Sequence, residues 1–64
     1  MSLADNIRRL REQKRLSQSE LAEKAGVTQP AIDYFEKGKR IPNGFTLVEI
    51  AKSLDTTAEE LVSE

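Results

Sequence analysis

Cysteine and histidine are both absent from this chain of 64 residues. Without them the chain cannot form disulfide bonds, thiolate nucleophiles, histidine general bases or the zinc sites that need these ligands. The carboxylates do not follow the spacing of a calcium-binding loop. A chain this short also has little room for a deep pocket. We therefore expect no catalytic residues, no metal, no cofactor and no enzymatic activity.

Aromatic residues are scarce, at 5% of the chain, and no apolar run is long enough to span a membrane. The core must therefore come mainly from Leu, Ile, Val and Ala. The mixture of 38% hydrophobic and 33% charged residues excludes a disordered tail. The first residues do not resemble a signal peptide. We expect a cytoplasmic protein with no membrane partner, folded as one domain over residues 1–64.

The net charge is only −1, but the charges are unevenly distributed. Residues 1–16 contain five basic and two acidic side chains, whereas residues 45–64 contain one basic and five acidic side chains. The basic end can face phosphates while the acidic end faces solvent or a basic partner. The alternative is that both charge runs are ordinary solvated helix faces.

Helix-capping residues divide the chain into five predicted helices, and no stretch alternates apolar and polar residues as a strand does. Each predicted start has a side-chain oxygen that can accept from a backbone N–H of the first turn. The capping residues are Ser2, Ser17, Thr28, Asn43 and Thr57. The helices are expected over residues 3–14, 18–25 and 28–37, then from Asn43 to Asp55 and from Thr57 to Val62. The sequence thus predicts an all-α fold.

The segment from Gln18 to Glu36 meets the separate requirements of a helix-turn-helix. Gly26 supplies a residue that tolerates positive φ between the two helices. Ala22 is small where the two backbones must approach. The apolar residues that can lock the second helix onto the first are Leu21, Val27, Ile32 and Phe35.

Several stretches together resemble the Cro and phage-repressor (Xre-like) helix-turn-helix family. They are Leu16 to Ala22, Gly26 to Gln29, Ile32, Glu36 to Arg40 and Pro42. The resemblance covers nearly the whole chain. It implies an all-α, five-helix, lambda-repressor-like DNA-binding domain with a central helix-turn-helix. Such domains bind double-stranded DNA, often as homodimers on paired half-sites, and usually regulate transcription, most simply as repressors.

The resemblance also implies two classes of DNA contact, with helix 28–37 in the major groove. Gln29 is the main expected base reader, because a glutamine amide can bond N6 and N7 of adenine together. The full set of base-reading residues is Thr28, Gln29, Pro30 and Asp33. The phosphate-contacting residues are Gln18, Lys37, Lys39 and Arg40. The alternative for Gln18, Gln29, Lys39 and Arg40 is that they are exposed polar residues with no DNA contact.

Arg11 and Glu36 resemble a pair that bridges the first and third helices of the family. We interpret them as a structural ion pair and count neither as a DNA contact. Tyr34 is expected on the surface or at the rim of the DNA-binding face.

Asp33 departs from the family, which commonly has a small hydroxyl residue at this position. Phosphate repels a carboxylate, so Asp33 must either accept from a cytosine amino group or orient Lys37 four residues on. We favour the orienting role. Asp55 stands where the family has a helix-ending glycine, which predicts a small loss of stability. Thr56 replaces an apolar residue, which predicts a loosely held last helix.

A second hypothesis keeps the fold but not the DNA affinity. Asp33, Tyr34 and the acidic final third support a protein-interaction module, such as an antitoxin or adaptor that binds a toxin or regulator. The family resemblance implies a dimer surface near the fourth and fifth helices. Its candidates are Phe45, Val48 and Val62, with burial in the core as the alternative for each.

Overall fold

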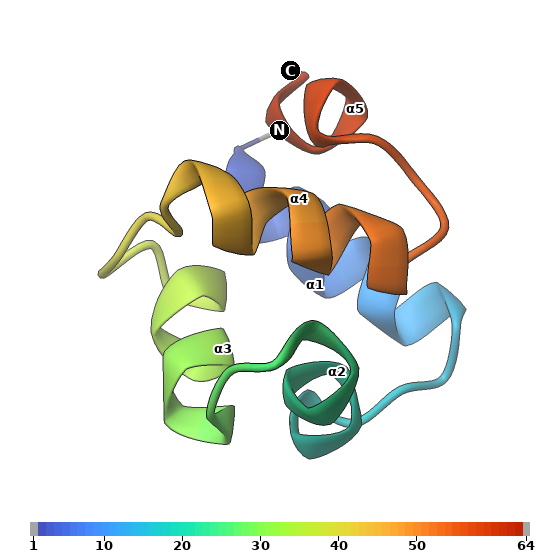
Figure 1. Ribbon diagram of the computed structural model, residues 1–64, viewed down its shortest axis with the longest axis vertical. Helices are drawn as coiled ribbons and strands as arrows, with labels where there is room; N and C mark the ends of the chain where they lie inside the picture. Colours follow the sequence, from blue (N-terminus) through green and yellow to red (C-terminus); the bar gives the residue numbers. More distant parts are fainter. Residues whose placement is uncertain (1, 64) are drawn as a thin grey trace.

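Each helix begins after the capping residue that the sequence predicts. In the computed structural model, which describes residues 2–63, each capping side chain accepts from a backbone N–H three residues on. The helices are α1 (Leu3–Gln13), α2 (Gln18–Ala25), α3 (Gln29–Glu36), α4 (Gly44–Ser53) and α5 (Ala58–Val62) (Figure 1). The prediction of an all-α fold with five helices is confirmed, and each helix ends close to its expected position.

Aliphatic side chains from all five helices meet in one core. α2 packs against α3 and α4, and α1 packs against α3 and α5. In Figure 1, α4 crosses in front of α1, while α2 and α3 lie together below them. Each helix contributes one fully buried side chain, and these are Ile7, Leu21, Ile32, Ile50 and Leu61. Burying a side chain of this size stabilises the fold by about 1.5–3 kcal/mol, which holds α3 firmly on the rest of the domain.

A buried asparagine ties the last helix to the first. Asn6 of α1 is 3% exposed, and its Nδ2 donates to the carbonyl oxygens of Leu61 and Ser63, each over 2.8 Å. These bonds satisfy carbonyls at the end of α5 that have no partner within that short helix. The expectation of a loosely held last helix is therefore wrong, although Thr56 does replace an apolar residue.

Four residues that follow helices have positive φ. Gly26 (φ 75°) and Gly38 (φ 72°) adopt this conformation without steric cost. Asp55 (φ 56°) confirms the expected glycine-type position after α4, and its carboxylate is paired with Lys14. Arg15 (φ 57°) occupies a similar position after α1, which the sequence analysis did not identify. The left-handed conformation costs a side-chain-bearing residue about 1 kcal/mol.

Candidate nucleic-acid interface

A tight turn joins α2 to α3. Gly26 ends α2 in the left-handed conformation, and the backbone N–H of Val27 donates to the carbonyl of Ala22 over 3.0 Å. Leu21 of α2 and Ile32 of α3 are both fully buried in the shared core. The turn and the core together hold α3 across α2 with one face inward and the opposite face toward solvent, which is the arrangement of a helix-turn-helix.

The predicted base-reading residues lie at the start and along the outer side of α3. Thr28, Gln29 and Pro30 are exposed, and Asp33 is half-buried. The Thr28 hydroxyl caps α3 by accepting from the N–H of Ala31 over 3.3 Å, and Pro30 occupies the first turn. The amide of Gln29 and the carboxylate of Asp33 are the other hydrogen-bonding side chains of this set.

The side chain of Gln18 connects the start of α2 to three residues of α3. Its Nε2 donates to Asp33 Oδ1 over 3.2 Å and to Glu36 Oε1 over 3.1 Å. Its Oε1 accepts from Gln29 Nε2 over 2.7 Å. The three partners stand at positions i, i+4 and i+7 of α3, which share one side of the helix. The side chain that the sequence predicts on a phosphate is thus bonded within the protein.

Arg11 and Glu36, the predicted ion pair, lie together between α1 and α3. Arg11 Nε donates to Glu36 Oε2 over 2.6 Å, and Arg11 Nη2 donates to Glu36 Oε1 over 3.0 Å. The remaining Arg11 Nη1 donates to the carbonyl of Leu16 over 2.7 Å. Hydrogen bonding to the Glu36 carboxylate raises the pKa of Arg11 above its ordinary value. This contact anchors the end of α3 and the start of the helix-turn-helix to α1.

Asp33 and Lys37 form an ion pair one turn apart on α3. Lys37 Nζ lies 2.9 Å from Asp33 Oδ2. Hydrogen bonding to Lys37, and then to Gln18, lowers the pKa of Asp33, and the Asp33 carboxylate raises the pKa of Lys37. The contact required by the orienting role of Asp33 is therefore present.

Lys39 and Arg40 follow α3 on an exposed connection that Gly38 starts. The backbone N–H of Lys39 donates to the carbonyl of Tyr34 over 3.0 Å, which holds the connection against the helix end. The Arg40 guanidinium lies 5.9 Å from the centre of the Tyr34 ring, within range of a cation–π contact. Tyr34 is 42% exposed, at the surface as expected, but its contact with Arg40 was not anticipated from the sequence.

A small recess of about 210 Å³ opens beside the Gln18 network. Its lining consists of Gln18, the two carboxylates it binds, their cationic partners Arg11 and Lys37, and Arg8. Arg8 is a residue that the sequence analysis did not include among the candidates. Arg8 stands three residues before Arg11 on α1, and this spacing, which places both on one helix face, was the available signal. Arg8 is also paired with Glu12 at 3.4 Å on the exposed side of α1. The recess therefore adds a cationic side chain next to the predicted phosphate contacts.

The candidate dimer residues are all exposed. The exposed fractions are 76% for Phe45, 42% for Val48 and 51% for Val62, which rules out the alternative of core burial. Ile41, at 83%, is a further exposed aliphatic residue close in sequence to α4 that the sequence analysis did not select. Apolar side chains this exposed are available for contact with another surface.

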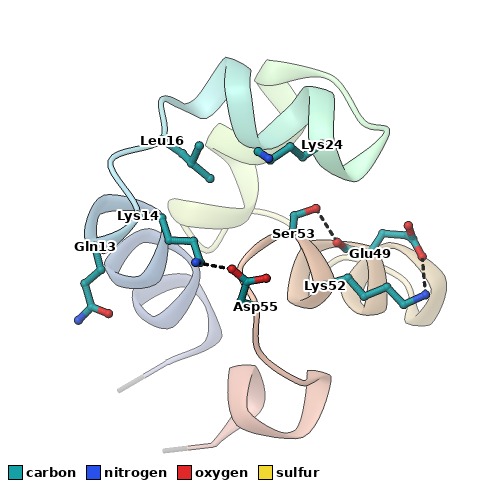
Figure 2. Close-up of a pocket in the computed structure, with 8 residues that line it drawn as sticks. All are labelled: Gln13, Lys14, Leu16, Lys24, Glu49, Lys52, Ser53 and Asp55. Atoms are coloured by element: carbon teal, nitrogen blue, oxygen red, sulfur yellow. Dashed lines mark hydrogen bonds and ion pairs between the residues drawn. The ribbon is translucent and has the colours of Figure 1, made fainter.

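A larger hollow of about 670 Å³ lies on a different part of the molecule (Figure 2). Its lining comes from α2, from α4, from the end of α1 and from the residues that follow α1 and α4. Four of its five charged side chains are paired, Lys14 with Asp55 and Lys52 with Glu49, and the fifth is Lys24. Within residues 2–63 there is no cluster of three or more His, Cys, Asp or Glu residues that could hold a metal. Across the same residues, no helix has the length and hydrophobicity to cross a bilayer. The candidate site is therefore the group of hydrogen-bonding side chains on and beside α3.

Comparisons of sequence identify relatives among regulators of transcription. A helix-turn-helix family model matches residues 7–61. YqaE of Bacillus subtilis, an uncharacterized HTH-type transcriptional regulator, is 37% identical over 59 residues, which are 92% of this chain and 51% of YqaE. The HTH-type transcriptional activator BcrR of Enterococcus faecalis is 38% identical over 63 residues, which are 98% of this chain and 31% of BcrR. The chain thus spans about half of the first relative and about a third of the second.

Comparisons of structure identify two similar proteins bound to DNA. The P22 c2 repressor in complex with a synthetic operator superposes with a TM-score of 0.95 at 27% identity, over 98% of this chain and 96% of that one. The biofilm master regulator SinR in complex with DNA superposes with a TM-score of 0.87 at 32% identity, over 92% and 95% of the two chains. Together with the match over residues 7–61, these likenesses confirm the resemblance noted in the sequence: the chain belongs to the Cro and phage-repressor type of helix-turn-helix family.

Proposed function

We propose that this chain binds double-stranded DNA in a sequence-specific manner and regulates transcription in the cytoplasm, most simply as a homodimeric repressor. The observation that carries the proposal is the outer side of α3, where Gln29, Asp33 and Lys37 form a polar stripe held to α2 and α1 by the Gln18 network and the Arg11–Glu36 pair. A stripe fixed in this way before binding loses little entropy on docking. The similarity to operator-bound P22 c2 repressor and DNA-bound SinR supports placing α3 in the major groove.

In this proposal the base-edge contacts come from the first turns of α3, from Thr28, Gln29, Pro30 and Asp33. Gln29 has the group best suited to read a base, because an amide offers one acceptor and one donor to adenine. Pro30 has no polar atom on its side chain and can contact only an apolar edge such as the thymine methyl group. These contacts set which sequence is bound.

The phosphate contacts in this proposal come from the two ends of the motif. Gln18 approaches one phosphate through its backbone N–H at the start of α2, because its side-chain amide is bonded to α3. Lys37, Lys39 and Arg40 approach other phosphates. Lys39 and Arg40 are exposed, so they can reach a strand without disturbing the core. These contacts set the register on the duplex and make the affinity depend on salt, because bound cations displace counterions from the phosphates.

The dimer in this proposal buries apolar residues of α4 and α5. Phe45 and Val48 stand three residues apart on α4 and are both exposed, so they can pack on a second copy of the chain. Sedimentation equilibrium tests this step. Phe45→Asp should shift the population toward monomer, and Glu59→Ala on the exposed side of α5 should not. A Phe45→Asp variant that associates as strongly as the parent would reject this surface.

The experiment that tests the main proposal is selection of the purified chain against a random duplex library at two salt concentrations. A palindromic motif, with half-sites about one helical turn apart, is the expected result for a dimer that reads sequence. The enrichment should weaken at the higher salt concentration. No enrichment even at low salt would overturn DNA binding and favour a protein partner instead.

A further inference from the structure

Two cations beside α3 have no carboxylate partner. Three neighbouring cations are each paired with a carboxylate, in the pairs Arg8–Glu12, Arg11–Glu36 and Lys37–Asp33. Within residues 2–63 no ion pair involves Lys39 or Arg40, and both residues are exposed. An anion that binds Lys39 and Arg40 therefore displaces no carboxylate of the protein, whereas an anion that binds Lys37 competes with Asp33.

Tyr34 contacts the residues that carry both of these cations. At the end of α3, Gly38 has φ of 72° and its N–H donates to the carbonyl of Phe35 over 3.2 Å. The N–H of Lys39 donates to the carbonyl of Tyr34 over 3.0 Å, which completes a Schellman motif and fixes the backbone of Lys39. The ring of Tyr34 lies under the guanidinium of Arg40, 5.9 Å from its central carbon.

A contact with an aromatic ring holds a guanidinium without using its hydrogen bonds. The ring attracts the cation through its quadrupole, and it has no lone pairs of the kind that a carboxylate offers to N–H groups. The N–H donors of Arg40 therefore stay available while the side chain is held in place. Those donors match phosphate oxygens, often two at a time.

Tyr34, Lys39 and Arg40 also line one shallow recess of about 360 Å³. The lining contains two cations and an aromatic ring, so the recess favours an anion. Tyr34 stands four residues after Pro30, so the recess lies on the same outer side of α3 as a residue proposed to face the bases. An anion in this position is a phosphate of the DNA backbone next to the base pairs that α3 contacts.

We infer that Tyr34 is a positioning residue, which holds Lys39 through its carbonyl and Arg40 through its ring so that both cations bind the same backbone phosphate. The inference rests on the proposed function and adds to it a phosphate subsite built around one residue of α3. Arg40 loses less side-chain freedom on binding when the ring already holds it. Since a phosphate contact carries no sequence information, the contribution of Tyr34 is equal for all duplexes.

The test is a double-mutant cycle on duplex affinity. Fluorescence anisotropy over a salt series is measured with one duplex from the selection and one of unrelated sequence. Arg40→Ala should weaken binding to both and reduce the slope of log affinity against log salt concentration by about 1. Tyr34→Leu should weaken binding to both by about two- to fivefold. It should also reduce the slope, although Tyr34 carries no charge, because Arg40 is no longer held at the phosphate.

The double variant and two controls isolate the contact between ring and guanidinium. Tyr34→Leu combined with Arg40→Ala should bind as weakly as Arg40→Ala alone. Tyr34→Phe retains the ring and loses only the hydroxyl, so it should keep the affinity and the slope of the parent. Lys52→Ala removes a charge away from α3, and adding Tyr34→Leu to it should cause the same two- to fivefold loss as in the parent.

The results that would overturn the inference are distinct from one another. If Tyr34→Leu changes the preferred sequence, Tyr34 reads a base directly. If the losses from Tyr34→Leu and Arg40→Ala multiply in the double variant, Tyr34 does not act through Arg40. If Tyr34→Phe binds as weakly as Tyr34→Leu, the hydroxyl and not the ring makes the contact.

Failure of the inference and failure of the proposed function can be told apart. If the parent binds its selected duplex and Tyr34→Leu binds it equally well with the same slope, only the inference is overturned. If the parent binds neither duplex even at low salt, the proposed function fails and the phosphate subsite is rejected with it.

Discussion

The Arg11 guanidinium holds the Glu36 carboxylate with two hydrogen bonds, of 2.6 Å and 3.0 Å, and the side chains are only 12% and 4% exposed. The same guanidinium binds the carbonyl of Leu16, just before α2 begins. One cation therefore connects α1, the entry to α2 and the end of α3. Because the planar guanidinium matches the carboxylate in one orientation, this largely buried pair fixes how the two side chains lie relative to each other.

Removing one partner of this pair should destabilise the fold. Glu36→Ala leaves the Arg11 charge largely buried without its carboxylate, and we expect a loss of about 2–3 kcal/mol. For a domain of this size that loss lowers the midpoint of thermal unfolding by roughly 10 °C or more. Glu12→Ala, which removes the partner of Arg8 in an exposed pair, is the control and should change stability by less than about 0.5 kcal/mol. Equal melting temperatures for Glu36→Ala and the parent chain would contradict the structural role.

A phosphate contact should be visible in the salt dependence of binding. Lys39→Ala should weaken all duplexes alike and reduce the slope of log affinity against log salt concentration by about 1. Fluorescence anisotropy over a salt series measures the slope. Lys52→Ala removes the same charge beside the hollow of Figure 2, away from α3, and should leave the slope nearly unchanged. A slope that falls equally in both variants would mean that Lys39 acts only through net charge.

The left-handed residue after α1 offers a stabilising substitution. Arg15 has φ of 57°, and Arg15→Gly should raise the free energy of unfolding by about 0.5–1 kcal/mol, because glycine adopts this conformation without a steric penalty. Urea denaturation at neutral pH measures the change. Arg8→Gly, at an exposed position in the middle of α1, should instead lower stability by about 1 kcal/mol. If the two substitutions change the free energy of unfolding in opposite directions, the effect at residue 15 comes from backbone strain and not from glycine in general. An Arg15→Gly variant less stable than the parent would argue against strain at residue 15.

The domain should lose stability in acid. Hydrogen bonds from the backbone of Ser17 lower the pKa of Glu20, while Lys37 and Lys14 lower the pKa values of Asp33 and Asp55. Since these groups bind protons more weakly in the folded chain than in the unfolded one, their contribution is complete above their ordinary pKa values. It is lost as the pH falls through the lowered values, below about pH 4.

Urea denaturation at pH 7, 4 and 3 tests this expectation. Glu20→Gln and Asp33→Asn should each be less sensitive to acid than the parent, because the substituted group no longer takes up a proton. Stability that does not change between pH 7 and pH 3 would contradict the inferred direction of all three shifts.

Local chemistry explains why the helices and the turn were predictable. The side-chain oxygens of Ser17 and Thr28 each accept from the backbone N–H three residues on. The start of a helix therefore depends on only a few neighbouring residues and can be predicted from them. Gly26 marks the end of α2 for the same local reason. The i, i+4 spacing of Asp33 and Lys37 likewise indicated their contact before the structure did.

The contacts of Gln18 and Asn6 could not be predicted in this way. From the sequence alone, Gln18 is expected to be an exposed residue in the first turn of a helix. Its partners at positions 29, 33 and 36 come within hydrogen-bonding distance only because α3 crosses the start of α2. Asn6 reads as a polar residue on an amphipathic helix, and the docking of α5 alone gives its amide two carbonyls. In both cases the partners are separated by many residues, and no local pattern encodes their distance.

The sequence by itself determined the helix boundaries, the left-handed turn at Gly26 and the family, because each depends on neighbouring residues or on a short motif. The tertiary structure decided which side chains form hydrogen bonds between helices. These are the bonds of Arg11 to Glu36, of Gln18 to residues of α3, and of Asn6 to carbonyl groups of α5. Those contacts depend on the angle and the distance at which the helices pack around the shared core. Packing is a property of the whole chain, so these contacts become visible only once the fold is complete.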